Sequence, residues 1–262
     1  MLLYGVELAD YMKERHRGQV RSRRRPPRLA VIWSGDDPAS QRYIGVKERY
    51  GADIGVEVTV ENVTAETAAV LAAVKRANRD LDVTGLVVQL PLPSGVDTDA
   101  VLAEIELAKD VDGLGQHSPF EPATPKAIMW LLSSRGLSLK ELKVAIIGQG
   151  RLVGAPLAEM MRAAGGEVAT ADETTKDLAA VTTSAAVIVS ATGQPGLVTA
   201  ELVKAGAIII DAGTSVVAGQ LVGDVDPALY DRDDLIITPV PGGVGPVTVA
   251  ALFDNLLIAA SG

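Results

Sequence analysis

A tyrosine, a lysine and a glutamine have the types and spacing in this sequence that best suit proton transfer. Tyr43 and Lys47 are four residues apart, so on a helix opened by Ser40 they would share one face. Burial lowers the pKa of a lysine toward the range useful for general acid–base chemistry. Gln89 ends an apolar run that predicts a buried strand, and its amide could hydrogen-bond Lys47. Without Gln89, the other two residues would be more typical of an exposed helix surface.

A second group of residues has the order of a dinucleotide-binding turn. The apolar run 144–147 leads into Gly148, Gln149 and Gly150, and a helix is expected from about residue 154. Glycines let the backbone approach a pyrophosphate, and a helix N-terminus offers free N–H groups to it. Because the turn lies between an expected strand and an expected helix, it predicts a nicotinamide dinucleotide site.

An acidic pair occupies the place where such a site meets the adenosine ribose. The strand expected over 167–172 ends in Asp172, roughly 20 residues beyond the turn, and Glu173 follows. Carboxylates there can hold the ribose hydroxyls of NAD and would repel the extra phosphate of NADP. The alternative is an ordinary polar strand end.

Two parallel sheets are expected to position these residues. Short apolar runs alternate with helical periodicity, which is typical of sheets covered by helices on both faces. The expected strands are 29–33, 85–90, 144–147, 186–190, 207–211 and 235–238, and the expected helices include 65–78, 98–104, 125–134, 154–164, 199–205 and 247–260. The fold class is therefore α/β with two domains and a cleft between them. Residues 1–122 plus 244–262 are assigned to a catalytic domain, and 123–243 to a Rossmann dinucleotide-binding domain.

Four segments resemble the motifs of the bifunctional methylenetetrahydrofolate dehydrogenase/methenyltetrahydrofolate cyclohydrolase family. Their order and spacing agree along nearly the whole chain. They are Gly35–Ser40 with Tyr43 and Lys47, Val88–Pro93, Lys109–Gly113 and Thr238–Pro246. The resemblance implies oxidation of methylenetetrahydrofolate to methenyltetrahydrofolate with NAD(P), and then hydrolysis to formyltetrahydrofolate, in one-carbon metabolism.

The resemblance also implies roles for individual residues. Asp112 would bind the pterin ring of folate, because a carboxylate can accept hydrogen bonds from neighbouring amino and ring N–H groups. With it, the implied catalytic residues are Tyr43, Lys47 and Gln89. Further implied substrate contacts are Pro241, Gly242, Gly243 and Pro246, and further implied cofactor contacts are Thr192, Gly193 and Thr214. A homodimer is implied as well, and an apolar edge strand near 56–60 agrees with it.

Two departures from the family pattern bear on the cofactor. The family usually has Gly-Arg-Ser where this chain has Gly148, Gln149 and Gly150, and often His-Ser where it has Asp172 and Glu173. The first change removes a cation that could pair with the extra phosphate of NADP, and the second adds repulsion. NAD is therefore expected to be preferred to NADP.

Composition excludes several other classes. The formal charge of −9 disfavours nucleic-acid binding. The basic segment 21–28 is interpreted as a solvated helix end, with docking of an anionic tail such as folate polyglutamate as the alternative. There is no cysteine, and His16 and His117 lie far apart in sequence, so no metal site is expected. Neither a signal-peptide pattern nor a long apolar segment occurs, so a cytoplasmic protein without membrane contact is expected.

Three other functions are the alternatives. They are a folate- or nucleotide-binding protein without turnover, a dehydrogenase without cyclohydrolase activity, and a Rossmann dehydrogenase for a hydroxy or amino acid. An intact Lys47 disfavours the first alternative. The third would leave Tyr43, Gln89 and Asp112 unexplained.

Overall fold

The computed structural model describes residues 1–261, apart from the side chain of Ala39, and divides the chain into two compact units. One unit contains residues 10–123 together with the chain from 249 onward, and we call it the three-stranded unit. The other contains residues 1–9 and 124–248, and we call it the five-stranded unit. Each unit is therefore built from two separate stretches of sequence.

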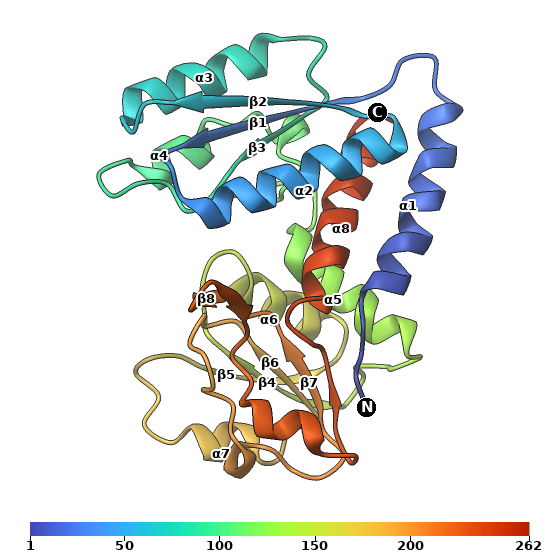
Figure 1. Cartoon of the computed structure of the whole chain (residues 1–262), viewed down its shortest axis with the longest axis vertical. Helices are drawn as coiled ribbons and strands as arrows, with labels where there is room; N and C mark the ends of the chain where they lie inside the picture. Colours follow the sequence, from blue (N-terminus) through green and yellow to red (C-terminus); the bar gives the residue numbers. More distant parts are fainter. Residues whose placement is uncertain (262) are drawn as a thin grey trace. The chain divides into compact units, whose positions relative to one another are not determined.

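The three-stranded unit is a parallel sheet with the strand order β2-β1-β3. Helices α2 and α3 connect consecutive strands and lie on opposite faces of this sheet (Figure 1). The elements in chain order are α1 (Val6–Arg21), β1 (Arg28–Ser34), α2 (Pro38–Ile54), β2 (Glu57–Val63), α3 (Thr67–Arg79), β3 (Gly85–Val88), α4 (Thr98–Ala103) and the short 3₁₀ helix η1 (Leu107–Lys109). Strand β2 forms an edge and pairs with β1 alone, as the sequence led us to expect.

The five-stranded unit is a parallel sheet with the order β10-β7-β6-β4-β5. The order reverses at β4, and open α/β sheets bind their ligands at such a switch point. The elements are α5 (Ala123–Ser134), β4 (Lys143–Ile147), α6 (Gly154–Ala163), β5 (Glu167–Ala171), α7 (Leu178–Thr182), β6 (Val187–Ser190), η2 (Ala200–Leu202), β7 (Ile208–Asp211), β8 (Ser215–Val217), β9 (Gln220–Val222), η3 (Pro227–Asp231) and β10 (Ile236–Ile237). Helix α8 (Val244–Ala259) begins in this unit, and from residue 249 it belongs to the three-stranded unit.

The inner strands are apolar because helices cover them on both faces. The inner strand β6 is buried along its whole length, and so is β3, although β3 ends the sheet opposite β2. In the three-stranded unit, Val70, Ala73 and Val74 of α3 pack on the inner strands. In the five-stranded unit, the core is formed by a row of aliphatic side chains from successive strands, among them Ala145, Ile147, Ile188, Ile209 and Ile237.

The first residues of the chain lie in the five-stranded unit, whereas the sequence assigned them to the catalytic domain. Leu2 forms a parallel bridge with Ile237, the Leu3 N–H donates to the Ile237 carbonyl at 2.8 Å, and the Ile237 N–H donates to the Met1 carbonyl at 3.1 Å. These bonds give the short strand β10 an outer neighbour. A single bridge leaves no periodicity in the sequence, so pattern analysis could not place it.

Two further expectations differ from the structure. The helix expected over 199–205 is only the 3₁₀ turn η2, which ends shortly before Gly206 turns the chain with φ 77°. The hairpin of β8 and β9 was not predicted, because its strands are three residues long and none of their residues is buried. Among residues 1–261, no helix combines the length and the apolar character that crossing a membrane would require.

Candidate active site

Lys47 and Gln89 meet in the three-stranded unit. Lys47 Nζ donates a hydrogen bond to Gln89 Oε1 at 2.9 Å, and Gln89 Nε2 donates to the Leu90 carbonyl at 2.7 Å. The second bond fixes the amide so that its oxygen faces the lysine. Gln89 is 9% exposed and directly follows β3. A buried strand therefore holds the acceptor, while α2 supplies the lysine.

Helix α2 begins two residues earlier than expected. The sequence placed its start at Ser40, but the cap is Asp37, whose side chain accepts the Ser40 N–H at 2.8 Å, and Pro38 occupies the first turn. A proline suits that position because its fixed φ and missing N–H cost nothing there. Tyr43 and Lys47 still lie one turn apart on this helix, and Tyr43 is 38% exposed.

Asp112 is the charged group that acts on Lys47. Burial lowers the pKa of Lys47, and the nearby Asp112 carboxylate opposes that effect. Burial raises the pKa of Asp112, Lys47 opposes this, and Asp110 adds to it. The ammonium and the carboxylate thus belong to one electrostatic site, in which small changes of charge alter the protonation of both.

Two residues that sequence reasoning missed hold the loop that carries Asp112. Buried Asp110 accepts the Gly115 N–H at 2.8 Å. Asn255 of α8 donates from Nδ2 to the Val111 carbonyl at 2.9 Å and to the Glu121 carbonyl at 2.8 Å. The available signals were an aspartate inside the motif Lys109–Gly113 and an amide within a largely apolar helix.

The glycine turn lies at the end of β4 in the five-stranded unit. Its N–H at Gly148 donates to the Ala171 carbonyl at 2.8 Å, and φ is 93°. A Cβ at Gly148 would come within 2.6 Å of the Ala191 carbonyl oxygen, and one at Gly154 would overlap the Gly148 carbonyl. Gly150, by contrast, has open space around it. Two of these glycines are therefore required by the fold, and the third leaves room for a ligand.

The acidic pair follows β5 beside this turn. Asp172 Oδ1 accepts hydrogen bonds from the Thr174 N–H at 2.9 Å and from Thr174 Oγ1 at 2.7 Å. These bonds hold the pKa of the Asp172 carboxyl below its usual range, so the group is charged at neutral pH. Glu173 is exposed next to it. The fit to a dinucleotide is good, because a glycine turn, a helix start and an acidic strand end occur at neighbouring strands β4 and β5.

The remaining expected contacts also lie in the five-stranded unit. Thr192 and Gly193 follow β6, Thr214 follows β7, and Ser215 Oγ joins the two loops by donating to the Gly193 carbonyl at 2.6 Å. Of the glycine-proline run, Gly242 accepts the Gly5 N–H at 2.8 Å. Gly243 lies so close to Gly5 that no side chain fits at residue 5. Pro241 precedes this contact, and Pro246 is part of helix α8.

The family is decided by comparison with known proteins. Residues 3–112 match the model of the tetrahydrofolate dehydrogenase/cyclohydrolase catalytic domain, and residues 122–262 match that of the tetrahydrofolate dehydrogenase/cyclohydrolase NAD(P)-binding domain. The chain belongs to the tetrahydrofolate dehydrogenase/cyclohydrolase family.

Similar proteins cover almost the whole chain. The bifunctional protein FolD of Acidiphilium cryptum is 41% identical over 247 residues, which are 90% of this chain and 88% of that protein. The crystal structure of the bifunctional FolD enzyme from Campylobacter jejuni is 35% identical, with a TM-score of 0.94 and coverage of 100% and 98%. The enzyme from Trypanosoma brucei, solved with NADP and an inhibitor, is 32% identical, with a TM-score of 0.93 and coverage of 100% and 97%.

These findings confirm the predicted family, the α/β class and the bifunctional dehydrogenase/cyclohydrolase activity in folate one-carbon metabolism. The five-stranded unit contains most of the NAD(P)-binding domain of this family. Within residues 1–261, no group of three or more histidine, cysteine or acidic side chains is arranged to hold a metal ion.

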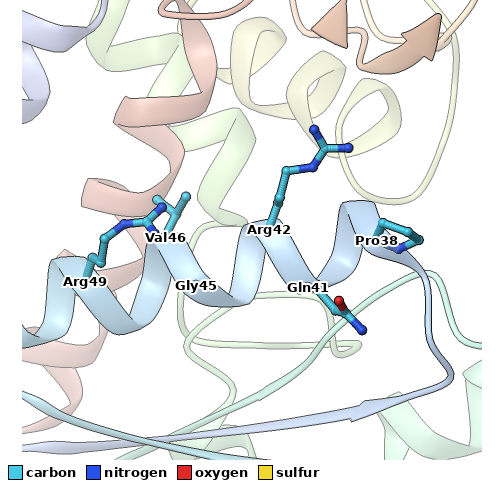
Figure 2. A pocket seen from close by; sticks show the side chains of 6 residues that line it. All are labelled: Pro38, Gln41, Arg42, Gly45, Val46 and Arg49. Atoms are coloured by element: carbon cyan, nitrogen blue, oxygen red, sulfur yellow. The ribbon is translucent and has the colours of Figure 1, made fainter. Parts of the chain in front are cut away.

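The exposed face of α2 carries a shallow groove of about 520 Å³. Figure 2 shows the side chains of Arg42, Val46 and Arg49 on one side of the helix and that of Gln41 on the other. The complete lining is Pro38, Gln41, Arg42, Gly45, Val46 and Arg49. In the described part of the chain, neither guanidinium has an ion pair or a hydrogen bond with another residue.

The basic segment 21–28 is largely engaged within the fold. Arg23 donates to the Leu257 carbonyl at 2.8 Å and so caps the end of α8. Arg25 pairs with Asp82 at 2.7 Å, and Arg28 pairs with Glu57 at 3.2 Å. These three cations therefore already have partners within the fold, and their contacts hold the segment in place after the end of α1.

Proposed function

We propose that Lys47, with Gln89 and Asp112, carries the folate chemistry of this enzyme. The observation behind the proposal is the hydrogen bond from Lys47 Nζ to Gln89 Oε1 beside the Asp112 carboxylate. A lysine whose pKa is lowered by burial can exchange protons near neutral pH, and the glutamine directs its nitrogen. Asp112 suits the amino and N–H edge of a pterin, and the exposed ring of Tyr43 suits a stacked ligand.

Oxidation and hydrolysis then follow in sequence at one folate site. A bound dinucleotide would supply the acceptor for the hydride that leaves the methylene carbon. The chain contributes orientation to this step, because Asp112 would fix the pterin and the loops after β6 and β7 would fix the dinucleotide. Water next attacks the methenyl carbon, and Lys47 assists the proton transfers. Opening of the ring places the carbonyl on one nitrogen and returns a proton to the solvent.

The dinucleotide proposed for this chain is NAD. Asp172 and Glu173 place two carboxylates next to the glycine turn, which has Gln149 and Gly150 where the family usually has an arginine and a serine, with Arg151 following them. A phosphate on the ribose would meet these charges at close range, whereas the ribose hydroxyls could donate to them. The Arg42–Arg49 groove is proposed to receive the carboxylates of the folate tail, because it holds two cations without protein partners on the helix that bears Lys47.

The decisive experiment is an absorbance assay on the purified protein. Methylenetetrahydrofolate is mixed with NAD or with NADP, and reduced nicotinamide and the methenyl compound are followed together. Nicotinamide reduction without accumulation of the methenyl compound is expected, and faster with NAD. Accumulation of the methenyl compound would indicate a dehydrogenase without cyclohydrolase activity. No reduction with either dinucleotide would contradict the proposal.

A homodimer in the cytoplasm is proposed with this function. Strand β2 is an open edge, and Val60 on it is 37% exposed. Unpaired strand edges commonly pair with a second chain. Light scattering coupled to gel filtration tests this part of the proposal, and a monomeric mass at micromolar concentration would contradict it.

A further inference from the structure

A buried aspartate that no motif indicated holds the end of strand β6. Asp224 is 0% exposed. Its Oδ2 accepts hydrogen bonds from Ser190 Oγ at 2.7 Å, from the Thr192 N–H at 2.8 Å and from Thr192 Oγ1 at 2.8 Å. Without this acceptor, the three hydrogen-bond donors would be left unpaired in a site that excludes water. The path of the chain from 190 to 192 is therefore set by one carboxylate oxygen.

The other oxygen of Asp224 faces the loop after β7. Within residues 1–261, Oδ1 has no hydrogen-bond partner, and it lies against Gly213 so closely that a Cβ there would overlap it. No side chain is compatible with position 213 in this arrangement. The backbone that leads to Thr214 thus passes directly beside the carboxylate.

Asp211 completes the connection from the end of β7. It is 1% exposed, and its Oδ1 accepts the N–H groups of Gly213 and Asp224, both at 3.0 Å. Its Oδ2 accepts the Val225 N–H at 3.0 Å. The same carboxylate therefore binds the backbone of Asp224 and the loop after β7. The loop after β7 and the segment that carries Asp224 therefore cannot shift relative to each other without breaking these buried hydrogen bonds.

The arrangement serves position more than stability. Among the described residues no cation is bonded to either aspartate. Carboxylates buried in this way are costly to desolvate. What the carboxylates provide is a set of strong, directional acceptors that bind two loops at the carboxyl edge of the sheet, where open α/β folds place their ligands.

We propose that Asp224 is a positioning residue for the nicotinamide end of the dinucleotide, acting through Thr192 and Gly213. The inference rests on the proposed function, because it takes Thr192, Gly193 and Thr214 as contacts of the dinucleotide. Asp224 itself touches neither substrate. Its effect is to keep the loops after β6 and β7 in one relative position, so that the nicotinamide meets a preformed surface.

The two activities of the enzyme provide the test. Hydrolysis of methenyltetrahydrofolate requires no dinucleotide, so it reports folding and the folate site independently. Asp224→Asn keeps the shape and one acceptor but removes the charge. We expect a KM for NAD that is higher by about tenfold, a kcat reduced by less, and hydrolysis at more than about half the wild-type rate. Asp226→Asn, at a half-buried aspartate two residues on whose side chain accepts the Ala228 N–H at the start of η3, is the matched control and should leave the KM unchanged.

A variant of a donor keeps the test valid if Asp224→Asn misfolds. Ser190→Ala leaves Asp224 in place and removes one donor that is itself buried and is not a proposed contact of the dinucleotide. It should raise the KM for NAD without slowing hydrolysis. A wild-type KM in Ser190→Ala, or equal losses of both activities in Asp224→Asn, would overturn the inference. If the wild-type protein reduces neither dinucleotide, the proposed function fails instead. Calorimetry then decides the inference, and equal NAD dissociation constants for wild type and Ser190→Ala would overturn it.

Discussion

Lys47 Nζ lies 2.9 Å from Gln89 Oε1, and the amide that accepts this hydrogen bond is itself fixed by a bond from its Nε2 to the Leu90 carbonyl. The lysine of helix α2 is thus directed by a residue that directly follows strand β3. This relationship leads to the first two predictions.

Lys47→Met should abolish hydrolysis of methenyltetrahydrofolate while the protein stays folded. Methionine preserves the length and the apolar stem of the side chain but cannot transfer a proton. A loss of at least about a hundredfold in kcat is expected, since positioned acid–base groups typically contribute that much. The exposed helix residue Lys75, which pairs with Glu104, gives the control variant Lys75→Met. Full hydrolysis by Lys47→Met would remove this residue from the mechanism.

Gln89→Glu should move the pH profile of hydrolysis to higher pH. A carboxylate in place of the amide would favour the charged ammonium and raise the pKa of Lys47, which burial holds low in the wild type. In the profile of kcat/KM against pH, the change that reports deprotonation of Lys47 should therefore occur at a higher pH. Rates across a pH series in constant ionic strength give the measurement. A change in kcat/KM at the same or a lower pH would show that a group other than Lys47 controls the profile.

The cofactor preference should follow the charge at the end of β5. The double variant Asp172→Asn with Glu173→Gln keeps both shapes and removes both charges. The ratio of kcat/KM for NAD to that for NADP should fall by about tenfold or more, mainly through better use of NADP. Glu159→Gln, an exposed acid on α6 of the same unit, serves as the control. A wild-type enzyme that already favours NADP would contradict the proposed preference.

Removal of both cations from the α2 groove should weaken binding of substrates with long glutamate tails. Arg42→Ala with Arg49→Ala should raise the KM for a pentaglutamyl folate by about tenfold, with a smaller effect on the monoglutamate. High salt should reduce the difference, because the contacts are exposed. Arg79→Ala on α3 removes an exposed cation elsewhere and should have no such effect. Equal KM changes for the two substrates would place the tail outside this groove.

The buried carboxyl of Asp211 should make stability depend on pH. Burial raises its pKa to about 6, above the unfolded value near 3.8, so the folded protein binds this proton more tightly. The resulting stability is present below the unfolded pKa and is lost as pH rises toward 6 and slightly beyond. Relative to Asp211→Asn, the wild-type free energy of unfolding should fall by about 2 kcal/mol between about pH 4 and pH 7. Urea titrations of both proteins measure this, and a constant difference would contradict the assignment.

The inner strands could be predicted because burial on both faces makes them uniformly apolar. The runs at 144–147 and 186–190 correspond to β4 and β6 within one residue at each end. Short or exposed elements carry no such signal, which explains why the β8–β9 hairpin was missed and why the helix expected at 199–205 is only one 3₁₀ turn.

The residues of the candidate site likewise differ in whether the sequence could predict their contacts. Lys47 and Gln89 could be paired from their types and their neighbouring elements. Asp224 could not, because its partners Ser190 and Thr192 are far from it in sequence and meet it only through the sheet topology. Asn255 was missed for the same reason, since an amide in an apolar helix does not reveal which carbonyls it faces.

The two hydrogen bonds of Asn255 also constrain the order of events during synthesis. They tie the loop around Asp112 to α8, a segment translated more than about a hundred residues after that loop. Until α8 has been synthesised, the three-stranded unit lacks the helix that fixes the loop carrying Asp112. With the role proposed for Asp112, nascent chains interrupted earlier would have Lys47 and Gln89 but no fixed contact for the pterin.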